Sequence, residues 1–207
     1  MNFARLPAVA IGRVKAALFL FALVPFARLL VGAFTNDLGT NPIELITRST
    51  GTWTLVSLCI TLAVTPARKF SGWHWLAQTR RMFGLFAFFY AACHFTTFIW
   101  FDHFFDFEEI WADVLKRPFV TIGFSAFLLL VPLAVTSTNG MVRRLGAARW
   151  QALHRTVYLI AVLGVVHYWW LIKRDLTQPL IYAAVVASLL GMRLITRRSR
   201  KVASRAG

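Results

Sequence analysis

Three histidines stand in long hydrophobic segments of this sequence, and their side chains are the best candidates for chemistry. His94 lies inside one such segment, and His154 and His167 lie thirteen residues apart on another. An imidazole in hydrocarbon is costly unless a metal or a polar group binds it, so an intramembrane histidine indicates a functional site. Neutral imidazole is a favoured ligand of metals, haem iron among them. Three such residues on two helices therefore predict a porphyrin held between transmembrane segments.

The elements that position these histidines follow from the hydropathy of the chain. Its 207 residues are 58% hydrophobic and 15% charged, more apolar and less charged than a typical soluble domain. The apolar residues form six runs that reach, or nearly reach, the length needed to cross a hydrocarbon core of about 30 Å. We therefore expect an all-α integral membrane protein with six transmembrane helices in a single domain, residues 1–207. The expected helices are 16–34, 50–65, 82–101, 118–136, 153–172 and 179–195, of which the second and the last need their flanks to complete a span.

Charge is distributed unevenly between the two sets of loops. Of the 23 lysines and arginines, 17 lie in the segments 1–15, 66–81, 137–155 and 193–207, which contain no acid. All eight acids belong to the opposite side. Because Lys and Arg stay on the cytoplasmic side, both termini are expected in the cytoplasm. Topology thus explains the net charge of +15 without nucleic-acid binding, and the basic tail at 197–201 is expected to contact membrane lipid headgroups.

Counting along the helices gives the depth of each histidine. His94 lies about 18 Å and His167 about 21 Å from the basic ends of their helices, at about 1.5 Å per residue. The two are therefore expected to ligate one b-type haem between the third and fifth helices. Nearby positions on these two helices are small, namely Gly84, Ala87, Ala91, Ala161 and Gly164. Small residues let a macrocycle approach the backbone, and they also let two helices pack closely without a cofactor.

His154 lies at the basic boundary, about 20 Å from His167 along the predicted helix. At the matching depth on the third helix stand Arg80 and Arg81. Arginine is a poor iron ligand, but it binds haem propionates, or the headgroup of a flavin or quinone, well. Two interpretations stay open: His154 ligates a second haem with an unusual or weak partner, or it belongs to a polar site for the electron donor. A continuous helix would turn His154 and His167 about 140° apart, so either the helix distorts near Gly164 or the two rings face different neighbours.

The other histidines and the cysteines are expected to have ordinary roles. His74 stands between two tryptophans in a basic loop, and His103 follows the third helix. Cys59 and Cys93 fall within predicted spans and are expected to be packing residues. The sequence has no Cys-x-x-Cys-His motif, so covalent attachment of haem is not expected.

Several segments carry a resemblance to known proteins. They are LAVTP at 62–66, TRRMFGL at 79–85, LAVTSTNG at 133–140 and LGAARWQALHRTVYL at 145–159, together with His94 and the pair His167-Tyr168. On these segments the chain resembles the ferric-reductase-like transmembrane domain that ferric reductases and NADPH oxidases share. It is more similar still to the MsrQ family, also called YedZ, from the second helix onward.

The resemblance implies a haem-binding electron-transfer subunit of the bacterial inner membrane, a redox subunit and not the catalytic one. Such a subunit draws electrons from the quinone pool or a flavin and passes them to a periplasmic, molybdenum-containing MsrP-like enzyme that repairs methionine sulfoxide in oxidised proteins. FMN is also associated with the family, and no motif here maps its site. Where the larger oxidases carry an inner histidine on the third helix, this chain has Arg80 and Arg81, so a second bis-histidine haem lacks one ligand.

Two other functions compete with this interpretation. A ferric reductase acting on a small-molecule acceptor would need a separate flavoprotein donor, because only about twelve residues follow the last predicted span. A transporter with a histidine proton relay would need acids within the spans, and none is predicted there. The acidic loop 102–113 mixes five acids with four aromatic residues, which suits either a partner-docking surface or an amphipathic segment at the membrane interface.

Overall fold

The computed structural model describes residues 6–172 and 175–203, without the side chains of 196–203. The predicted lipid-binding tail at 197–201 therefore lies outside the described side chains. The described residues form helices joined by turns and short connections, and none of them lies in a strand. In chain order the helices are α1 (Ala8–Thr35), α2 (Pro42–Ser71), α3 (Arg80–Thr97), α4 (Phe107–Lys116), α5 (Pro118–Val135), α6 (Asn139–Leu145), α7 (Ala147–His154), α8 (Val157–Leu171) and α9 (Thr177–Ala203), with a 3₁₀ turn η1 (His74–Thr79) before α3 and a π turn η2 (Phe98–Asp102) after it.

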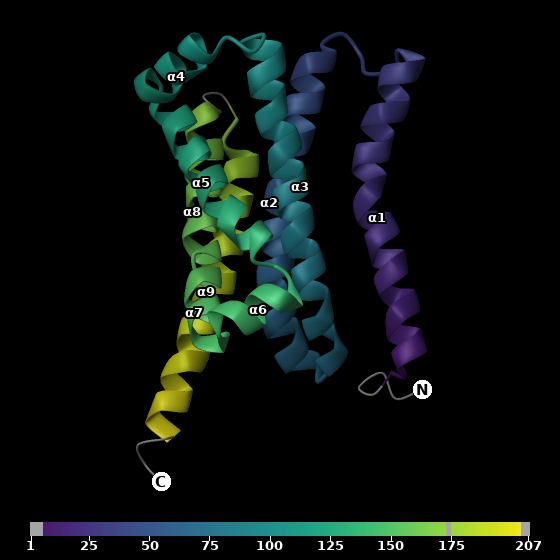
Figure 1. The fold of residues 1–207 in the computed structure, drawn as a ribbon, viewed down its shortest axis with the longest axis vertical. Coiled ribbons are helices and arrows are strands. Elements are labelled where there is room, and N and C mark those ends of the chain that lie inside the picture. The colour runs from purple at the N-terminus through teal and green to yellow at the C-terminus, as the bar shows by residue number, and fades with distance from the viewer. Residues whose placement is uncertain (1–5, 173–174, 204–207) are drawn as a thin grey trace.

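The long helices form one bundle, and the short ones lie across its two ends (Figure 1). The closest pairs are α2 with α3 and α5 with α8, and α9 packs against both α2 and α8. Helix α1 stands at one side of the bundle, against α2 and α3. The fold is thus all-α, as the sequence predicts.

The two ends of the bundle differ in charge. We call the end with the connections 36–41, 98–117 and 172–176 the acidic end, because all eight acids lie in or beside these segments. The other end, which carries α6, α7 and the connection between α2 and α3, is called the basic end. Helix α1 begins and α9 ends at the basic end (Figure 1). The predicted segregation of charge is therefore a property of the folded molecule.

Among the residues that the structure describes, five helical segments are long and apolar enough to cross a membrane. They are Ala8–Thr35, Pro42–Ser71, His74–Asp102, Pro118–Val135 and Thr177–Ile195. The predicted helix 153–172 is interrupted instead, since α7 ends at His154 and α8 begins at Val157. The backbone N–H and the hydroxyl of Thr156 both donate to the carbonyl of Leu153, at 3.0 and 2.8 Å, so a tight turn takes the acceptor that a continuing helix would use.

Local signals explain why α2 is much longer than the predicted span 50–65. The side chain of Asn41 accepts a hydrogen bond from the Glu44 N–H at 3.2 Å and donates one to its carboxylate at 2.9 Å. Pro42 follows at the first helical position, which suits a residue without an N–H. At the other end Gly72 adopts φ +71°, a conformation that few other residues tolerate.

Helix α1 is held to α3 by one buried hydrogen bond as well as by aromatic packing. The hydroxyl of Tyr90, which is almost fully buried, donates to the carbonyl of Ala22 at 2.6 Å. Around it Phe83 and Phe86 pack with Ala22 in one hydrophobic cluster.

We expect Tyr90→Phe to lower the free energy of unfolding by about 0.6 kcal/mol, and by no more than about 1.7 kcal/mol, because interhelical hydrogen bonds in membranes contribute this much. Thermal unfolding in detergent, followed by circular dichroism, measures the change. Tyr182→Phe is the matched control, since no hydrogen bond of the Tyr182 hydroxyl is found among the described residues. An equal loss in both variants would contradict the assignment.

Candidate functional site

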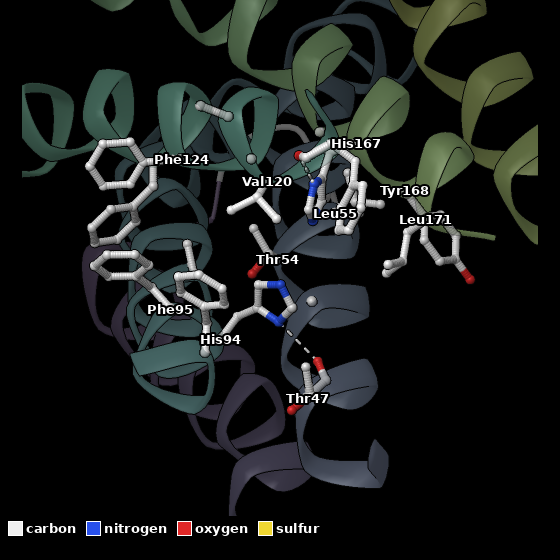
Figure 2. Close-up of a pocket in the computed structure, with 18 of the residues that line it drawn as sticks. Thr47, Thr54, Leu55, His94, Phe95, Val120, Phe124, His167, Tyr168 and Leu171 are labelled. Atoms are coloured by element: carbon white, nitrogen blue, oxygen red, sulfur yellow. Dashed lines mark hydrogen bonds between the residues drawn. The ribbon is translucent and has the colours of Figure 1, made fainter. Parts of the chain in front are cut away.

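His94 of α3 and His167 of α8 approach each other (Figure 2), each near the end of its helix that lies toward the acidic end of the bundle. Their ring centroids are 6.2 Å apart, and the ring planes are inclined by 76°. The structure thus brings together the two histidines that the sequence predicts as a pair.

Backbone carbonyls fix both imidazole rings. Nδ1–H of His94 donates to the carbonyl of Thr47 in α2 at 2.9 Å, and Nδ1–H of His167 donates to the carbonyl of Phe119 in α5 at 2.7 Å. Because a carbonyl can only accept, each Nδ1 carries the proton and each Nε2 keeps its lone pair. In Figure 2 the second nitrogen of each ring points toward the other ring. Such a hydrogen bond also makes a metal-binding imidazole more basic.

The separation of the rings suits a metal ion between them. Two imidazoles that ligate one ion from opposite sides, at about 2 Å per bond, have centroids roughly 6 Å apart. Within the described part of the chain no group of three or more His, Cys, Asp or Glu side chains can hold a metal ion.

A cavity of about 230 Å³ adjoins both rings. Its walls come from α2, α3, α5 and α8 and are mainly apolar and aromatic, with Arg48 and Asp102 as their charged members. The lining residues are Thr47, Arg48, Gly51, Thr52, Thr54, Leu55, Leu58, Ala91, His94, Phe95, Phe98, Asp102, Phe119, Val120, Gly123, Phe124, Ala126, Phe127, Leu130, Ile160, Gly164, His167, Tyr168 and Leu171.

Two glycines make room for the histidines, and the sequence pattern alone does not single out either of them. A Cβ atom on Gly51 of α2 would lie 3.2 Å from the His94 ring, and one on Gly123 of α5 would lie 2.7 Å from Nδ1 of His167. Each glycine stands four residues after the carbonyl that holds the same ring, Thr47 or Phe119. Both four-residue spacings are present in the sequence, but their meaning depends on knowing that α2 packs beside His94 and α5 beside His167.

The small residues that are predicted to flank a porphyrin have three different surroundings. Ala91 and Gly164 line the cavity. Ala87 and Ala161 are fully buried in hydrophobic clusters, where they allow close helix packing. Gly84 faces the methyl group of Thr61 at 4.0 Å.

His154 lies apart from this cavity, at the end of α7. Its ring stacks on Trp150 with centroids 3.9 Å apart, and its Nε2 lies 3.0 Å from the hydroxyl of Thr136. That hydroxyl donates to the carbonyl of Pro132 at 2.6 Å, so Nε2–H of His154 is the donor to Thr136. Burial lowers the pKa of His154, and the charge of Arg81 lowers it further, so both disfavour the protonated ring.

The side chains of the adjacent residues Arg80 and Arg81 have different neighbours. Arg81 lies near His154, as the pKa effect requires. Arg80 points to α2 instead, where its guanidinium donates to the hydroxyl of Thr65 at 2.6 Å. The polar site that the sequence predicts from Arg80, Arg81 and His154 is therefore divided between two sides of the bundle.

Comparison with known proteins assigns the chain to a family. The family described as "Ferric reductase like transmembrane component" matches residues 50–165. A protein of Herminiimonas arsenicoxydans named "Protein-methionine-sulfoxide reductase heme-binding subunit MsrQ" is 62% identical over 87% of this chain and 84% of its own length. Proteins of the same name are 54% identical in Ralstonia nicotianae, over 91% of this chain and 88% of the relative, and 49% identical in Bordetella pertussis, over 99% and 100%.

The chain belongs to the MsrQ family. This confirms the resemblance that the motifs indicate. The family match covers His94 and His154 and ends two residues before His167, whereas the alignment with the Bordetella pertussis member of the MsrQ family spans nearly the whole chain.

His103 has surroundings that the sequence did not predict. Its side chain is only 6% exposed, and its two ring nitrogens lie 3.5 Å from Glu109 and 3.2 Å from Asp113 of α4. Asp113 also pairs with Arg117 at 3.2 Å. These contacts place the His103 ring against α4 at the acidic end.

The glycine positions give a test of the histidine geometry. Gly123→Ala is expected to lower the free energy of unfolding by about 1–3 kcal/mol, because the added methyl group overpacks the His167 ring. Gly51→Ala is expected to lower the free energy of unfolding by less, because its added methyl group would lie 3.2 Å from the His94 ring. Thermal unfolding in detergent measures both.

Gly191→Ala is the matched control, since a Cβ there meets no other group within 4 Å among the described residues. In a helix this change should be neutral or stabilise by up to about 1 kcal/mol. Equal stability of the Gly123 and Gly191 variants would show that the ring is not confined as described.

Proposed function

We propose that the chain binds one b-type haem between α3 and α8, with Nε2 of His94 and of His167 as the axial ligands. The observation that carries the proposal is the facing pair of imidazoles, each with Nδ1 engaged by a carbonyl and Nε2 directed into a shared apolar cavity. The name of the relatives, heme-binding subunits, supports it. Haem iron, when bound, accepts and releases one electron at a time.

The residues around the cavity have distinct tasks. The carbonyls of Thr47 and Phe119 hold the two rings in one tautomer and one orientation. The apolar walls exclude water, which keeps the local dielectric constant low. Arg48 is the cation of the cavity wall; its exposed guanidinium pairs with Glu44 at 2.7 Å, and binding a carboxylate of the cofactor would require it to exchange or share this partner.

The topology that we propose places the basic end in the cytoplasm and the acidic end in the periplasm, within the bacterial inner membrane. The excess of Lys and Arg at the basic end supports this orientation. Helix α8, 15 residues and about 22 Å long, is proposed as the sixth span. It runs between α5 and α9 from the basic to the acidic end, so a chain with both ends on one side needs it to cross (Figure 1).

The function that follows is electron transfer across the membrane. The chain would receive electrons from the quinone pool or a flavin donor at the basic end and deliver them to a periplasmic MsrP-like molybdoenzyme that repairs oxidised proteins. Membership of a family whose members are named subunits of a protein-methionine-sulfoxide reductase supports this choice. His154 beside Arg81 remains our candidate for the entry site; as the ligand of a second haem it would have to use Nδ1, because its Nε2–H donates to Thr136.

Helix α4 is the element at the acidic end that we propose contacts the membrane interface and the partner enzyme. It lies across that end of the bundle (Figure 1), and its exposed apolar residues Phe107, Trp111 and Leu115 form one stripe. Such a stripe is typical of a helix in the membrane interface. The exposed carboxylates of Glu108 and Glu109 can attract a partner with a basic surface.

His94→Ala and His167→Ala are each expected to abolish the reduced-minus-oxidised spectrum of low-spin b-type haem, because each removes one axial ligand. His74→Ala, an exposed histidine at the basic end, is the matched control and should keep the full spectrum. Pyridine haemochromogen analysis should give one haem per chain. Retention of the spectrum in both ligand variants would overturn the pairing, and two haems per chain would assign a second centre to His154.

The acceptor that oxidises the protein faster distinguishes this function from that of a ferric reductase. The dithionite-reduced protein should be reoxidised by an MsrP-like enzyme with methionine sulfoxide at least about tenfold faster than by an equal concentration of ferric citrate, because a docked partner raises the encounter rate. Stopped-flow absorbance of the haem measures both rates. Faster oxidation by the chelate would favour a reductase that acts on small molecules.

A further inference from the structure

His103 is a buried histidine with a carboxylate of α4 near each of its ring nitrogens. Nδ1 lies 3.5 Å from the carboxylate of Glu109, and Nε2 lies 3.2 Å from that of Asp113. The ring of Phe98 packs edge-on against the imidazole, with centroids 4.6 Å apart. Among the described residues neither ring nitrogen makes a hydrogen bond of good geometry, so the two carboxylates are its polar neighbours at ion-pair distance.

The protonation state of this ring decides how it interacts with the two carboxylates. A neutral imidazole has one N–H and one lone pair, so it can donate to only one carboxylate and turns its lone pair toward the other. The imidazolium has two N–H groups and a positive charge, so it suits both carboxylates. Histidine ordinarily changes between these two forms near neutral pH. The position of α4 beside His103 therefore favours the protonated ring.

The other charged groups around the ring strengthen this preference. Asp102 precedes His103 and interacts electrostatically with it, with Asp113 and with Arg117. Arg117, just before α5, pairs with Asp113 at 3.2 Å. With Glu109 the cluster holds three carboxylates and one guanidinium, and a protonated His103 adds a second cation. Because like charges at close range repel one another, loss of the imidazolium charge destabilises this arrangement.

The connection between His103 and α4 is strained. Phe104 and Phe105 have φ values of +45° and +66°, in the left-handed region that residues with a Cβ atom rarely adopt. The side chain of Phe104 is 78% exposed, so its own packing does little to compensate. Such strain persists only where surrounding contacts maintain it. The position of α4 thus depends on contacts beyond the turn itself.

One part of these contacts is independent of pH. Ile110 and Val114 of α4 are 9% and 4% exposed, and the hydroxyl of Thr121 in α5 donates to the carbonyl of Val114. The contacts with His103 are the part that changes when the ring loses its proton. Deprotonation is therefore expected to loosen α4 on the acidic end of the bundle without unfolding the helix bundle.

We propose that His103 is a pH-sensitive latch for α4. The protonated ring attracts both Glu109 and Asp113 and keeps α4 packed on the acidic end. The neutral ring attracts only one of them, and α4 moves more freely. The exposed apolar stripe of α4 moves with it, so pH controls how firmly this surface is held. The latch goes beyond the electron-transfer function and depends neither on haem binding nor on the electron acceptor.

Hydrogen–deuterium exchange of the full chain in detergent, measured by mass spectrometry, tests the latch. Protection factors, which correct for the intrinsic effect of pH on exchange, are compared between pH 6 and pH 8, where histidine and not a carboxyl group ordinarily titrates. The protection of α4 should fall about tenfold at pH 8, the loss expected for one charge-assisted hydrogen bond. That of α5 should change less than about twofold. An equal fall in both helices, or no fall in α4, would overturn the proposal.

Two variants should remove the pH dependence in opposite ways. In Glu109→Gln the new amide can donate to the lone pair of a neutral His103 ring, so α4 should keep its high protection at pH 8. In His103→Gln the charge is absent, so the protection of α4 should be low at both pH values. Glu109 is 64% exposed, so its variant keeps the test valid if His103→Gln fails to fold.

Glu108→Gln is the matched control, because it removes an exposed carboxylate of the same helix that is not among the ion-pair partners of His103. This variant should keep the full pH dependence of the unmodified chain. Loss of the pH dependence in Glu108→Gln would overturn the proposal, and so would its retention in Glu109→Gln.

Discussion

A buried imidazole needs a partner for each ring nitrogen, and this requirement organises the centre of the molecule. His94 and His167 each give one nitrogen to a carbonyl of a neighbouring helix. The other nitrogen of each ring is directed toward the shared cavity. Two helices therefore supply the rings, and two more, α2 and α5, supply the carbonyls and the glycines beside them. Four helices have to keep their register for one site to exist.

The depth of the histidine pair could be predicted because the rise of an α-helix is fixed. Counting residues placed His94 and His167 at the same level, and the structure brings them together there. The continuity of the helix that carries His167 could not be obtained by counting. The turn at Arg155 and Thr156 depends on a local hydrogen bond that hydropathy does not report. The roles of Gly51 and Gly123 could not be predicted either, since they depend on which helices are neighbours.

Residues adjacent in sequence can serve different sites, as Arg80 and Arg81 show. Consecutive positions on a helix point about 100° apart, which lets the two guanidinium groups reach different neighbours. Arg80 reaches Thr65, while Arg81 acts on His154. The long extent of α2, by contrast, was readable in principle from Asn41, Pro42 and Gly72, because these residues mark helix ends by local chemistry.

The break between α7 and α8 also determines how the two histidines are positioned. His154 and His167 belong to separate rigid segments joined at Arg155 and Thr156. Helix α7 packs with α6 across one end of the bundle, whereas α8 is fixed lengthwise against α5. Helix α7 is nonetheless tied to α5 as well, because Nε1–H of Trp150 donates to the carbonyl of Thr136 at 2.9 Å, so one helix fixes the positions of both histidines.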